Sequence, residues 1–438
     1  MVYARIRSSH TNLKKKKKKK AAIMDGGLVG LRGSNFDSIP REIILYIFSL
    51  TLLTLPLHSL LRLRFVCKSW YVLITESAET YLKLSRETSL GIISYCYCYD
   101  NYFGVDGRRG KFFLRINSLQ IGGGFKALMT KSINTNTTSL DTRLYLLESI
   151  NGLIGLCDAK ENVHLCNPFI GEIVTLPCCD SGPVGRRRVI YVTGFGYASV
   201  TKQYKVIKLF GEYYKGKVFP KVKAAVITVG SSNSWRIVET PINNDKSIWR
   251  DTVFLDGTVY DKSTIWRNTI YLDGTIYWLN FYGIESVMIM AFDVSDETFR
   301  RIKPPSNLCD QFVSWKCLEI YEGRLCLVGF IQHPSKCLDL YIMLQDHRWV
   351  FRHRVLLEDF QPFDVQPFDI AGSYCIRFSC LNQGKLILRQ IGGGEWVFYD
   401  IDSKVLEAVE IGNNGLNTPG FTVVFCPFEE SLVPIPRG

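Results

Sequence analysis

The stretch Leu165–Val174 reads LCNPFIGEIV, and its pattern decides the fold class of most of the chain. An apolar run is followed by a short turn with Asn, Pro and Gly and then by a second apolar run, which is typical of two β-strands joined by a tight turn. Similar units occur at Ala291–Phe299, AFDVSDETF, and at Phe398–Leu406, FYDIDSKVL. Two further runs place a tryptophan at the start of an expected strand, at Trp235 and at Trp349.

These landmarks recur about every 50 to 70 residues between Asn167 and Asp400, and long amphipathic helices are absent from this part of the sequence. Repeating units of roughly 40 to 50 residues that form four strands each indicate a β-propeller. We therefore expect residues 90–438 to form one mainly-β, propeller-like domain with about six blades. The fold class predicted for the whole chain is α+β multidomain, with a small helical module before the propeller.

One interval is lengthened by a tandem copy. Residues 245–260 are nearly repeated by residues 261–277, and each copy contains an Asp-Gly pair flanked by β-forming residues. Because Asp-Gly favours a two-residue hairpin turn, each copy is able to form a hairpin. Only one copy is needed for the propeller, and we expect the other to form an added hairpin or loop.

Residues 36–85 carry the helical signals. Pro40 and Glu42 favour a helix start, because proline suits the first helical position and an acid suits the helix dipole. Apolar residues then follow at spacings of three and four, at Ile43, Ile44, Ile47 and Phe48. A second segment predicts one amphipathic helix with an apolar face made of Leu60, Leu63, Val66, Cys67, Trp70 and Ile74.

A membrane span is the competing interpretation of this region, because residues 43–61 contain no charged residue. Pro56 and His58 lie inside the run, and the amphipathic pattern continues through its end. We therefore expect a helical module and no membrane span.

The net charge of +12 does not describe the body of this 438-residue chain. Arg5, Arg7 and the run Lys14–Lys20 supply nine of these charges within residues 1–23. We interpret residues 1–35 as a disordered basic tail, and we expect no nucleic-acid partner for the near-neutral body. Met24, just after the lysine run, leaves open whether residues 1–23 belong to the mature protein.

The search for reactive groups favours a protein that is not an enzyme. The 14 cysteines form no Cys-x-x-Cys pair, and the six histidines are scattered, so we expect no metal and no cofactor. The run Gly211–Lys217 imitates a phosphate loop, but Val218 stands where Ser or Thr is required. Without a secretory signal, the cysteines indicate a reducing compartment, the cytoplasm or the nucleus.

The helical module resembles a known family. Ile39-Pro40, followed by Leu55–Trp70, LPLHSLLRLRFVCKSW, is similar to the plant F-box, whose pattern pairs Leu-Pro with a later LPxxSLLRFRxVCKSW. The resemblance implies docking on the Skp adaptor of cullin-RING ubiquitin ligases. The adaptor-binding residues expected from the resemblance and from the apolar pattern are Ile39, Pro40, Ile43, Ile47, Leu55, Pro56, Leu60, Leu63, Val66 and Trp70.

The module departs from the family pattern in one place. Sixteen positions separate Ile39 from Leu55, about four more than in the family, so Ser49–Thr54 holds an insertion. Four residues are close to one helical turn, and a longer first helix keeps its face in register but risks exposing the added leucines. The insertion leaves the adaptor affinity open.

The body also resembles a family, the F-box-associated domain of plant F-box proteins, which looks related to kelch-type propellers. The matching residues include Asn151–Ile154, Asn167-Pro168, Glu172, Gly194–Tyr197, Asp273–Leu279 and Glu430–Val433. Cys166 stands where the family usually has tryptophan.

Together the two resemblances imply a substrate-recognition subunit of a Skp-cullin-F-box ligase, with cullin and RING subunits bound through the adaptor. The protein target is unknown. The basic residues Arg186, Arg187 and Arg188 are candidate contacts for an acidic or phosphorylated target, although solvated loops are the favoured interpretation of this stretch. The alternative is a propeller interaction protein that joins no ligase because of the insertion.

Overall fold

In a computed structural model, the chain divides into two compact units, Met1–Ser77 and Ala78–Gly438. The structure describes Pro40, Glu42, Ile43, Tyr46, Ile47, Leu50, Leu55 and residues 57–78, 91–98, 111–120, 124–133, 144–158, 161–179, 187–213, 221–231, 234–240, 269–282, 286–308, 313–331, 336–356, 380–381, 385–389, 396–409, 426–429 and 431–437.

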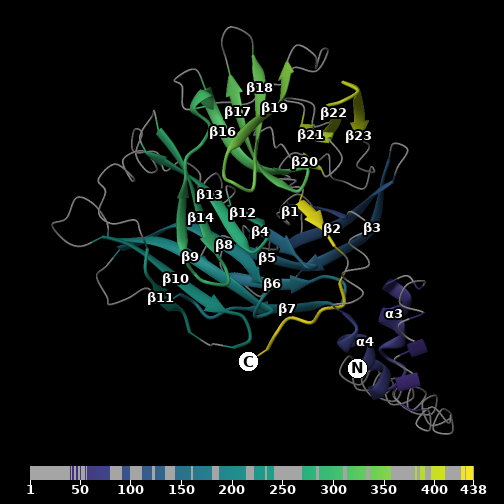
Figure 1. The fold of residues 1–438 in the computed structure, drawn as a ribbon. Coiled ribbons are helices and arrows are strands. Elements are labelled where there is room, and N and C mark those ends of the chain that lie inside the picture. Colours follow the sequence, from purple (N-terminus) through teal and green to yellow (C-terminus); the bar gives the residue numbers. More distant parts are fainter. Residues whose placement is uncertain are drawn as a thin grey trace, which may run out of the picture. The chain divides into compact units, whose positions relative to one another are not determined.

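The first unit is helical, as expected, but the second helical segment is not one helix. It forms α3 (Leu57–Leu63) and α4 (Lys68–Glu76), which contact each other (Figure 1). The backbone N–H of Phe65 donates to the carbonyl of Arg62, and that of Val66 donates to the carbonyl of Leu63, each at 3.1 Å. These i→i+3 bonds tighten the end of α3 and turn the chain.

Cys67 completes the break, because its extended backbone (φ −157°, ψ 170°) makes it the N-cap of α4. The predicted single helix is therefore wrong, and its predicted apolar face fails at Val66 and Cys67, which are exposed in and after the turn. Leu60 on α3 and Leu73 and Ile74 on α4 are fully or almost fully buried, whereas Val66 is exposed. Two short helices bury more apolar surface against each other than one continuous helix buries alone.

The second unit is built from four-stranded antiparallel sheets, six of which lie in the described residues. Five of them consist of consecutive strands: β4 (Leu144–Ile150), β5 (Leu153–Asp158), β6 (Val163–Asn167) and β7 (Glu172–Thr175); β8 (Arg187–Ala198), β9 (Gln203–Tyr213), β10 (Lys221–Thr228) and β11 (Arg236–Val238); β12 (Thr269–Leu272), β13 (Thr275–Tyr282), β14 (Ser286–Asp293) and β15 (Phe299–Ile302); β16 (Val313–Tyr321), β17 (Arg324–Ile331), β18 (Cys337–Met343) and β19 (Trp349–Leu356); and β20 (Cys380–Leu381), β21 (Lys385–Arg389), β22 (Trp396–Asp400) and β23 (Leu406–Val409). Each of the five landmarks in the sequence falls in a different one of these sheets.

The remaining sheet joins the two ends of the unit. Its order is β24 (Cys426–Phe428), β1 (Gly91–Cys98), β2 (Lys111–Gln120) and β3 (Gly124–Ile133), and β24 pairs antiparallel with β1 (Figure 1). Its sequence carries none of the landmarks, because one of its strands comes from the far end of the chain. Closure of this kind leaves only short outer edges on the sheets.

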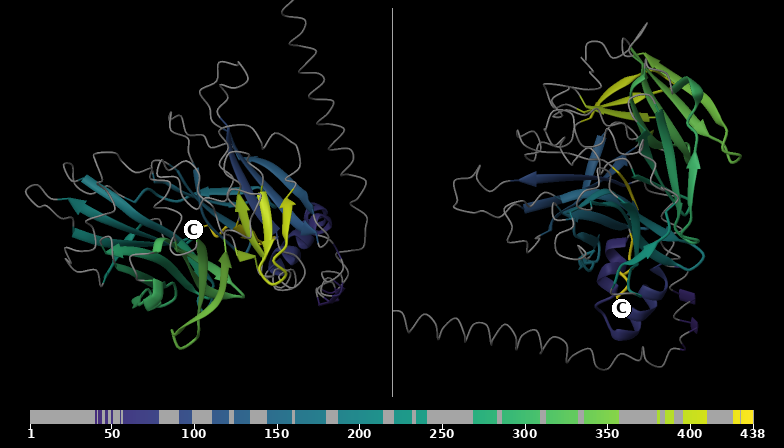
Figure 2. Two further views of the ribbon diagram at one scale, coloured as in Figure 1. Left: turned by 90° about the horizontal axis from the view of Figure 1, so that it is seen from above. Right: turned by 90° about the vertical axis from the view of Figure 1, so that its left-hand side faces the viewer.

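The first strands of neighbouring sheets pack together. β4 contacts β8, β12 and β24, and β12 and β20 each contact β16. Figure 2 shows the β20–β23 sheet (yellow) beside the β16–β19 sheet (green) in both of its views. Buried apolar residues fill the layers between sheets, for example Leu165, Phe195 and Val206 in one layer. This packing is the one expected of a propeller-like domain.

Two kinds of turn recur. The first and second strands are joined by Asn151-Gly152 between β4 and β5 and by Asp273-Gly274 between β12 and β13, with positive φ at every position. Positive φ at both central residues defines the type I′ hairpin turn, which suits Asn or Asp followed by Gly. The second tandem copy forms the β12–β13 hairpin, and the first copy lies outside the described residues.

The third and fourth strands are joined by a turn in which an Asn or Asp side chain accepts hydrogen bonds from the backbone. Asn167, Asp293 and Asp400 each accept two backbone N–H bonds, from the residues two and three positions later. The residue four positions later has positive φ in all three turns, at Gly171, Glu297 and Lys404. The carboxylates of Asp293 and Asp400 are thus turn residues, as expected from the sequence.

Candidate functional site

The helical unit presents an apolar surface. Ile43, Ile47 and Leu50, all in helical conformation, are 50%, 49% and 53% exposed, and Val66 and Phe65 in the turn after α3 are 59% and 87% exposed. Isolated apolar side chains on a surface are ordinary, but five within one small module indicate a surface that a partner covers.

The other predicted adaptor-binding residues differ in position. Leu60 is completely buried and belongs to the core of the unit, so it is not part of the exposed surface. Pro40 is exposed, and Leu55, Leu63 and Trp70 are half-buried. Ile39 and Pro56 lie outside the described residues. The inserted stretch Ser49–Thr54 is described only at Leu50, whose exposure agrees with the expected risk for the added leucines.

Arg64 holds the turn between α3 and α4 in place. Its guanidinium lies over the ring of Tyr71, 4.7 Å from the ring centroid, and its Nη2 is 3.5 Å from Oγ1 of Thr75. Arg64 is buried although it is charged, because α4 supplies both contacts. The sequence pattern gave no sign of this role, since Arg64 lies between apolar positions of the presumed single helix.

The basic residues proposed as target contacts are only partly visible. Arg187 and Arg188 begin β8, and their backbones pair with Tyr213 and Glu212 of β9. Arg186 lies outside the described residues, as do the side chains of Arg187 and Arg188.

Two buried lysines on β9 connect its sheet to both neighbouring sheets. Nζ of Lys205 donates to the carbonyl oxygen of Val294 at 2.8 Å and pairs with the carboxylate of Glu297 at 2.8 Å, both in the turn between β14 and β15. Burial alone would raise the pKa of Glu297, but hydrogen bonds from Arg236 and Lys205 outweigh it and hold the pKa below its ordinary value. The Glu297 carboxyl is therefore ionised at neutral pH.

Lys208 points to the opposite side. Its Nζ donates to the carbonyl of Glu161, between β5 and β6, and lies 5.1 Å from the centroid of the Trp235 ring. Nε1 of Trp235 donates to the carbonyl of Pro177 at 2.7 Å, and that residue follows β7. The junction therefore joins the β4–β7 and β8–β11 sheets.

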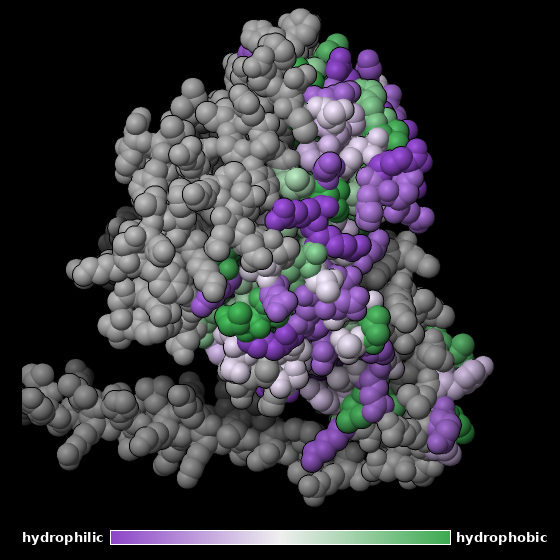
Figure 3. Space-filling view, turned by 60° about the vertical axis from the view of Figure 1, so that its left-hand side comes forward, coloured by the Kyte–Doolittle hydropathy of each residue, from purple (hydrophilic) through white to green (hydrophobic). Residues whose placement is uncertain are grey.

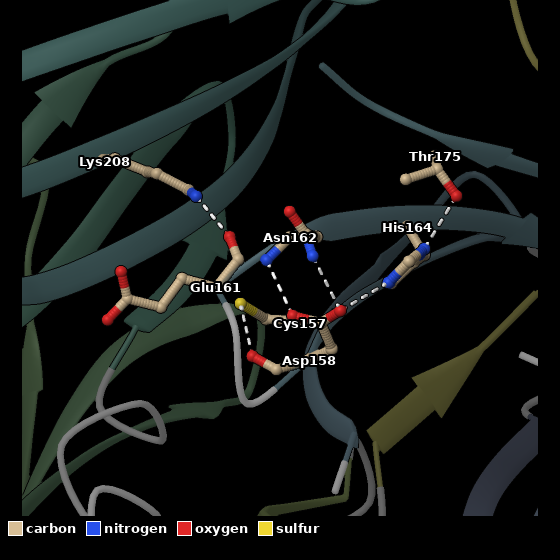
Figure 4. Close-up of polar contacts among 7 residues, drawn as sticks. All are labelled: Cys157, Asp158, Glu161, Asn162, His164, Thr175 and Lys208. Carbon is tan, nitrogen blue, oxygen red and sulfur yellow. Dashed lines mark hydrogen bonds and ion pairs between the residues drawn. The ribbon is translucent and has the colours of Figure 1, made fainter. Parts of the chain in front are cut away.

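The same junction contains a buried acid and a histidine (Figure 4). Asp158 accepts hydrogen bonds from the backbone and side-chain nitrogens of Asn162 at 2.8 and 2.9 Å, and Nε2 of His164 lies 3.4 Å from its Oδ2. Burial alone would raise the pKa of Asp158, but the bonds from His164 and Asn162 lower it. Nδ1 of His164 is 2.9 Å from Oγ1 of Thr175 on β7.

This Asp–His–Thr arrangement is better explained by folding than by catalysis. Every ring nitrogen and carboxylate oxygen in it has a partner: Asn162 and His164 bind Asp158 at the β5–β6 turn, and His164 joins this turn to Thr175 on β7. Burial raises the pKa of the neighbouring Cys157 thiol to about 12, so this thiol is not an activated nucleophile. Within the described residues, no group of three or more His, Cys, Asp or Glu side chains is placed to hold a metal ion. No helix among those residues is long and apolar enough to cross a membrane.

The outer strands place apolar residues on the surface of the second unit. Ile173 on β7, Ile237 on β11, and Val350 and Phe351 on β19 are exposed. On the face shown in Figure 3, hydrophobic residues form small patches separated by hydrophilic ones. These scattered side chains do not define one binding surface.

Comparison with known proteins identifies both units. A family model for an F-box-like module matches residues 36–86, and a model for an F-box associated beta propeller domain matches residues 112–422. The chain belongs to the F-box associated β-propeller family. The F-box model covers the helices whose apolar surface is described above, and the propeller model covers most of the six sheets.

The relatives are plant F-box proteins. The chain is 31% identical over 186 residues to F-box protein At3g07870 of Arabidopsis thaliana, a match that covers 42% of this chain and 40% of that protein. It is 26% identical over 328 residues to putative F-box protein At4g09190 of the same plant, covering 73% of this chain and 72% of that protein. A match to putative F-box protein At1g26515, also from Arabidopsis thaliana, has 25% identity and covers 50% of this chain and 54% of that protein.

Solved structures match less well. TolB from Acinetobacter baumannii matches with a TM-score of 0.39 and 10% identity, over 83% of this chain and 73% of that chain. A likeness of this size carries no argument about fold or function. The kinship with kelch-type propellers stays a prediction.

Proposed function

We propose that this F-box protein is the substrate-recognition subunit of a Skp-cullin-F-box ubiquitin ligase. The F-box binds the Skp adaptor and through it the cullin and RING subunits, and the propeller binds a target protein for ubiquitination. The protein acts by holding the target near the subunits that transfer ubiquitin, so it needs no catalytic group of its own. The six sheets are then six blades, and the protein works in the cytoplasm or the nucleus.

The apolar surface of the F-box is the observation that carries this proposal. Ile43, Ile47 and Val66 are each at least 49% exposed, while the core of the module is supplied by other residues, among them Leu60 and Ile74. A helical module that leaves apolar side chains outside its own core fits a partner that receives them in a groove.

Co-purification with a Skp adaptor tests the proposal. We expect the unmodified chain to retain the adaptor, and the double substitution Ile43→Glu and Ile47→Glu to weaken binding by at least about tenfold, because two buried charges face the partner. Val200→Glu is the matched control, since Val200 is 84% exposed in the turn between β8 and β9. It should leave binding unchanged.

The second candidate function is that of a propeller interaction protein that joins no ligase, and it is tested by removing the insertion in the F-box. A chain that lacks residues 49–52 restores the family spacing, and Pro56→Ala removes a residue of the expected adaptor contact. If neither the unmodified chain nor the shortened chain binds the adaptor, the ligase proposal fails. The protein is then a propeller interaction protein outside a ligase.

The target side is tested separately. Replacing Arg186, Arg187 and Arg188 by Gln should weaken capture of an acidic target protein without changing adaptor binding. Unchanged capture would remove these arginines from the target surface.

A further inference from the structure

The segment Ser431–Arg437, here named the strap, is an irregular chain that runs past the β4–β5 and β6–β7 turns of the β4–β7 sheet. Nδ2 of Asn167 donates to the carbonyl oxygens of Ser431 and Val433 at 3.1 and 2.8 Å. On the far side of the same turn, the Glu172 carboxylate accepts the backbone N–H of Ile435 at 3.0 Å and lies 3.4 Å from Nη2 of Arg437. The strap is thus held mainly by its backbone.

Apolar contacts complete the attachment. Leu432 is fully buried, and Ile435 enters the same apolar layer as Leu165 and Val229. Two glycines also make room for the strap, Gly152 between β4 and β5 and Gly230 after β10 of the neighbouring sheet: a Cβ on Gly152 would overlap Ser431, and a Cβ on Gly230 would overlap Pro436. The surface is therefore shaped for a chain that passes over it.

Among the three equivalent turns, the one that meets the strap has Asn167 where the other two have aspartate. Asn167, Asp293 and Asp400 all accept backbone N–H bonds through one side-chain oxygen. Only an amide also has N–H groups to donate, whereas an ionised aspartate is an acceptor alone. The turn that meets the strap is the one with a donor for the strap's carbonyl oxygens.

We propose that the surface around Asn167 and Glu172 is a peptide-binding site, occupied in cis by the strap, that takes a similar extended segment of a second polypeptide. The expected ligand has apolar residues, prolines and a basic residue in the order of the strap, SLVPIPR. Backbone hydrogen bonds supply the affinity, the layer around Ile435 selects an apolar side chain, and Glu172 selects the basic residue. The inference concerns the propeller alone and does not depend on adaptor binding.

A tethered segment competes at an effective concentration in the millimolar range. A free peptide at micromolar concentration should therefore enter the site only when the strap is weakened. Two substitutions weaken the strap without touching the sheet: Ile435→Ser removes the buried anchor, and Arg437→Glu places a carboxylate against Glu172.

The test uses fluorescence anisotropy of labelled SLVPIPR with the full chain. We expect each strap variant to bind this peptide at least tenfold more tightly than the unmodified chain does. Adding Asn167→Ala to either variant should reduce that binding at least tenfold. Asn307→Ala is the matched control, because Asn307 is an exposed asparagine far from the strap in sequence, and it should change nothing.

Tryptophan fluorescence first shows that each variant keeps its fold, and Arg437→Glu serves alone if Ile435→Ser unfolds, since Arg437 is exposed. The proposal is overturned if the folded strap variants bind the peptide no better than the unmodified chain does. It is also overturned if they bind a scrambled peptide of the same composition equally well.

Discussion

Nζ of Lys205 on β9 lies 2.8 Å from Oε1 of Glu297 in the turn between β14 and β15, and the two side chains are only 7% and 14% exposed. Glu297 also pairs with Arg236, the first residue of β11, so two cations of one sheet hold an acid of the next. The acid has positive φ, and the carbonyls of Val294 and Ser295 in the same turn accept bonds from Lys205 at 2.8 and 3.4 Å. The ion pair and the turn therefore stabilise each other.

Replacement of Lys205 by Met should lower the free energy of unfolding by about 3 kcal/mol. Removal of one partner of a buried pair costs roughly 3 to 5 kcal/mol, and Arg236 offsets part of this by keeping Glu297 paired. Urea denaturation followed by tryptophan fluorescence measures the change. Lys336→Met, at an exposed lysine before β18, is the control and should change stability by less than about 0.5 kcal/mol. Equal effects of the two substitutions would contradict the role given to Lys205.

The repeating turns and the F-box were predictable because their causes are local. Asn167, Asp293 and Asp400 form bonds with residues two and three positions away, so a short window of sequence contains the whole interaction. The F-box motif is likewise a continuous string of residues.

The missed features depend on residues far apart in the chain. The strap joins Asn167 to Ser431, and Lys205 reaches Val294, so no local pattern indicates either contact. Asn167-Pro168, Glu172 and Glu430–Val433 are separate family motifs in the sequence, but the contact of Asn167 and Glu172 with the C-terminal segment appears only in the fold. The single helix predicted through Val66 was wrong because periodicity does not register a turn that keeps the apolar spacing.

Trp235 and Trp349 each stand at the start of the fourth strand of a sheet. Their hydrogen bonds should contribute additively to the free energy of unfolding. Nε1 of Trp235 donates to the carbonyl of Pro177 at 2.7 Å, and Nε1 of Trp349 donates to that of Lys303 at 2.9 Å. Each bond reaches the segment that follows the fourth strand of the preceding sheet. Trp→Phe keeps an aromatic ring and removes the donor, so each substitution should cost about 1 kcal/mol.

The double variant of Trp235 and Trp349 should lose the sum of the two single effects within about 0.5 kcal/mol, because the sites join different pairs of sheets and share no partner. Thermal or urea denaturation of the three variants measures this. A loss in the double variant equal to that of one single variant would show that the two bonds do not act independently.

The raised pKa of Glu148 predicts that the free energy of unfolding falls as the pH rises. It lies at a bulge of β4, between Leu146 and Ser149, and burial raises its pKa from 4.5 to about 8 although the residue as a whole is only half-buried. The folded state binds the proton of the Glu148 carboxyl more tightly than the unfolded state does. The stabilisation that results from this proton is therefore complete below pH 4.5 and is lost as the pH rises to 8. The loss is at most about 1.4 kcal/mol per pH unit.

The substitution Glu148→Gln removes this titration. The variant should therefore gain stability relative to the unmodified chain as the pH is raised from 5 to 8, which urea midpoints at the two values measure. Glu239→Gln, at an exposed glutamate after β11, is the matched control and should shift neither midpoint appreciably. A constant difference between Glu148→Gln and the unmodified chain at both pH values would refute the prediction.

Lys404 occupies a turn position that glycine fills in the equivalent turn of another sheet. Its φ is 57°, and its N–H donates to the carbonyl of Asp400 at 2.8 Å, just as Gly171, at φ 75°, donates to Asn167 at 2.9 Å. The left-handed conformation costs a residue with a Cβ about 1 kcal/mol, and glycine avoids most of this cost. Lys404 is exposed, so its side chain contributes little that would be lost.

Lys404→Gly should therefore raise the free energy of unfolding by about 0.5 to 1 kcal/mol, whereas Gly171→Ala should lower it by about 1 kcal/mol or more. The two substitutions test one backbone feature in opposite directions, and Lys404→Ala separates the loss of the side chain from the change in backbone freedom. Urea midpoints of the three variants measure the effects. If Lys404→Gly were no more stable than Lys404→Ala, the positive φ at position 404 would carry no backbone cost. The strain assigned to this position of the turn between the third and fourth strands would then be contradicted.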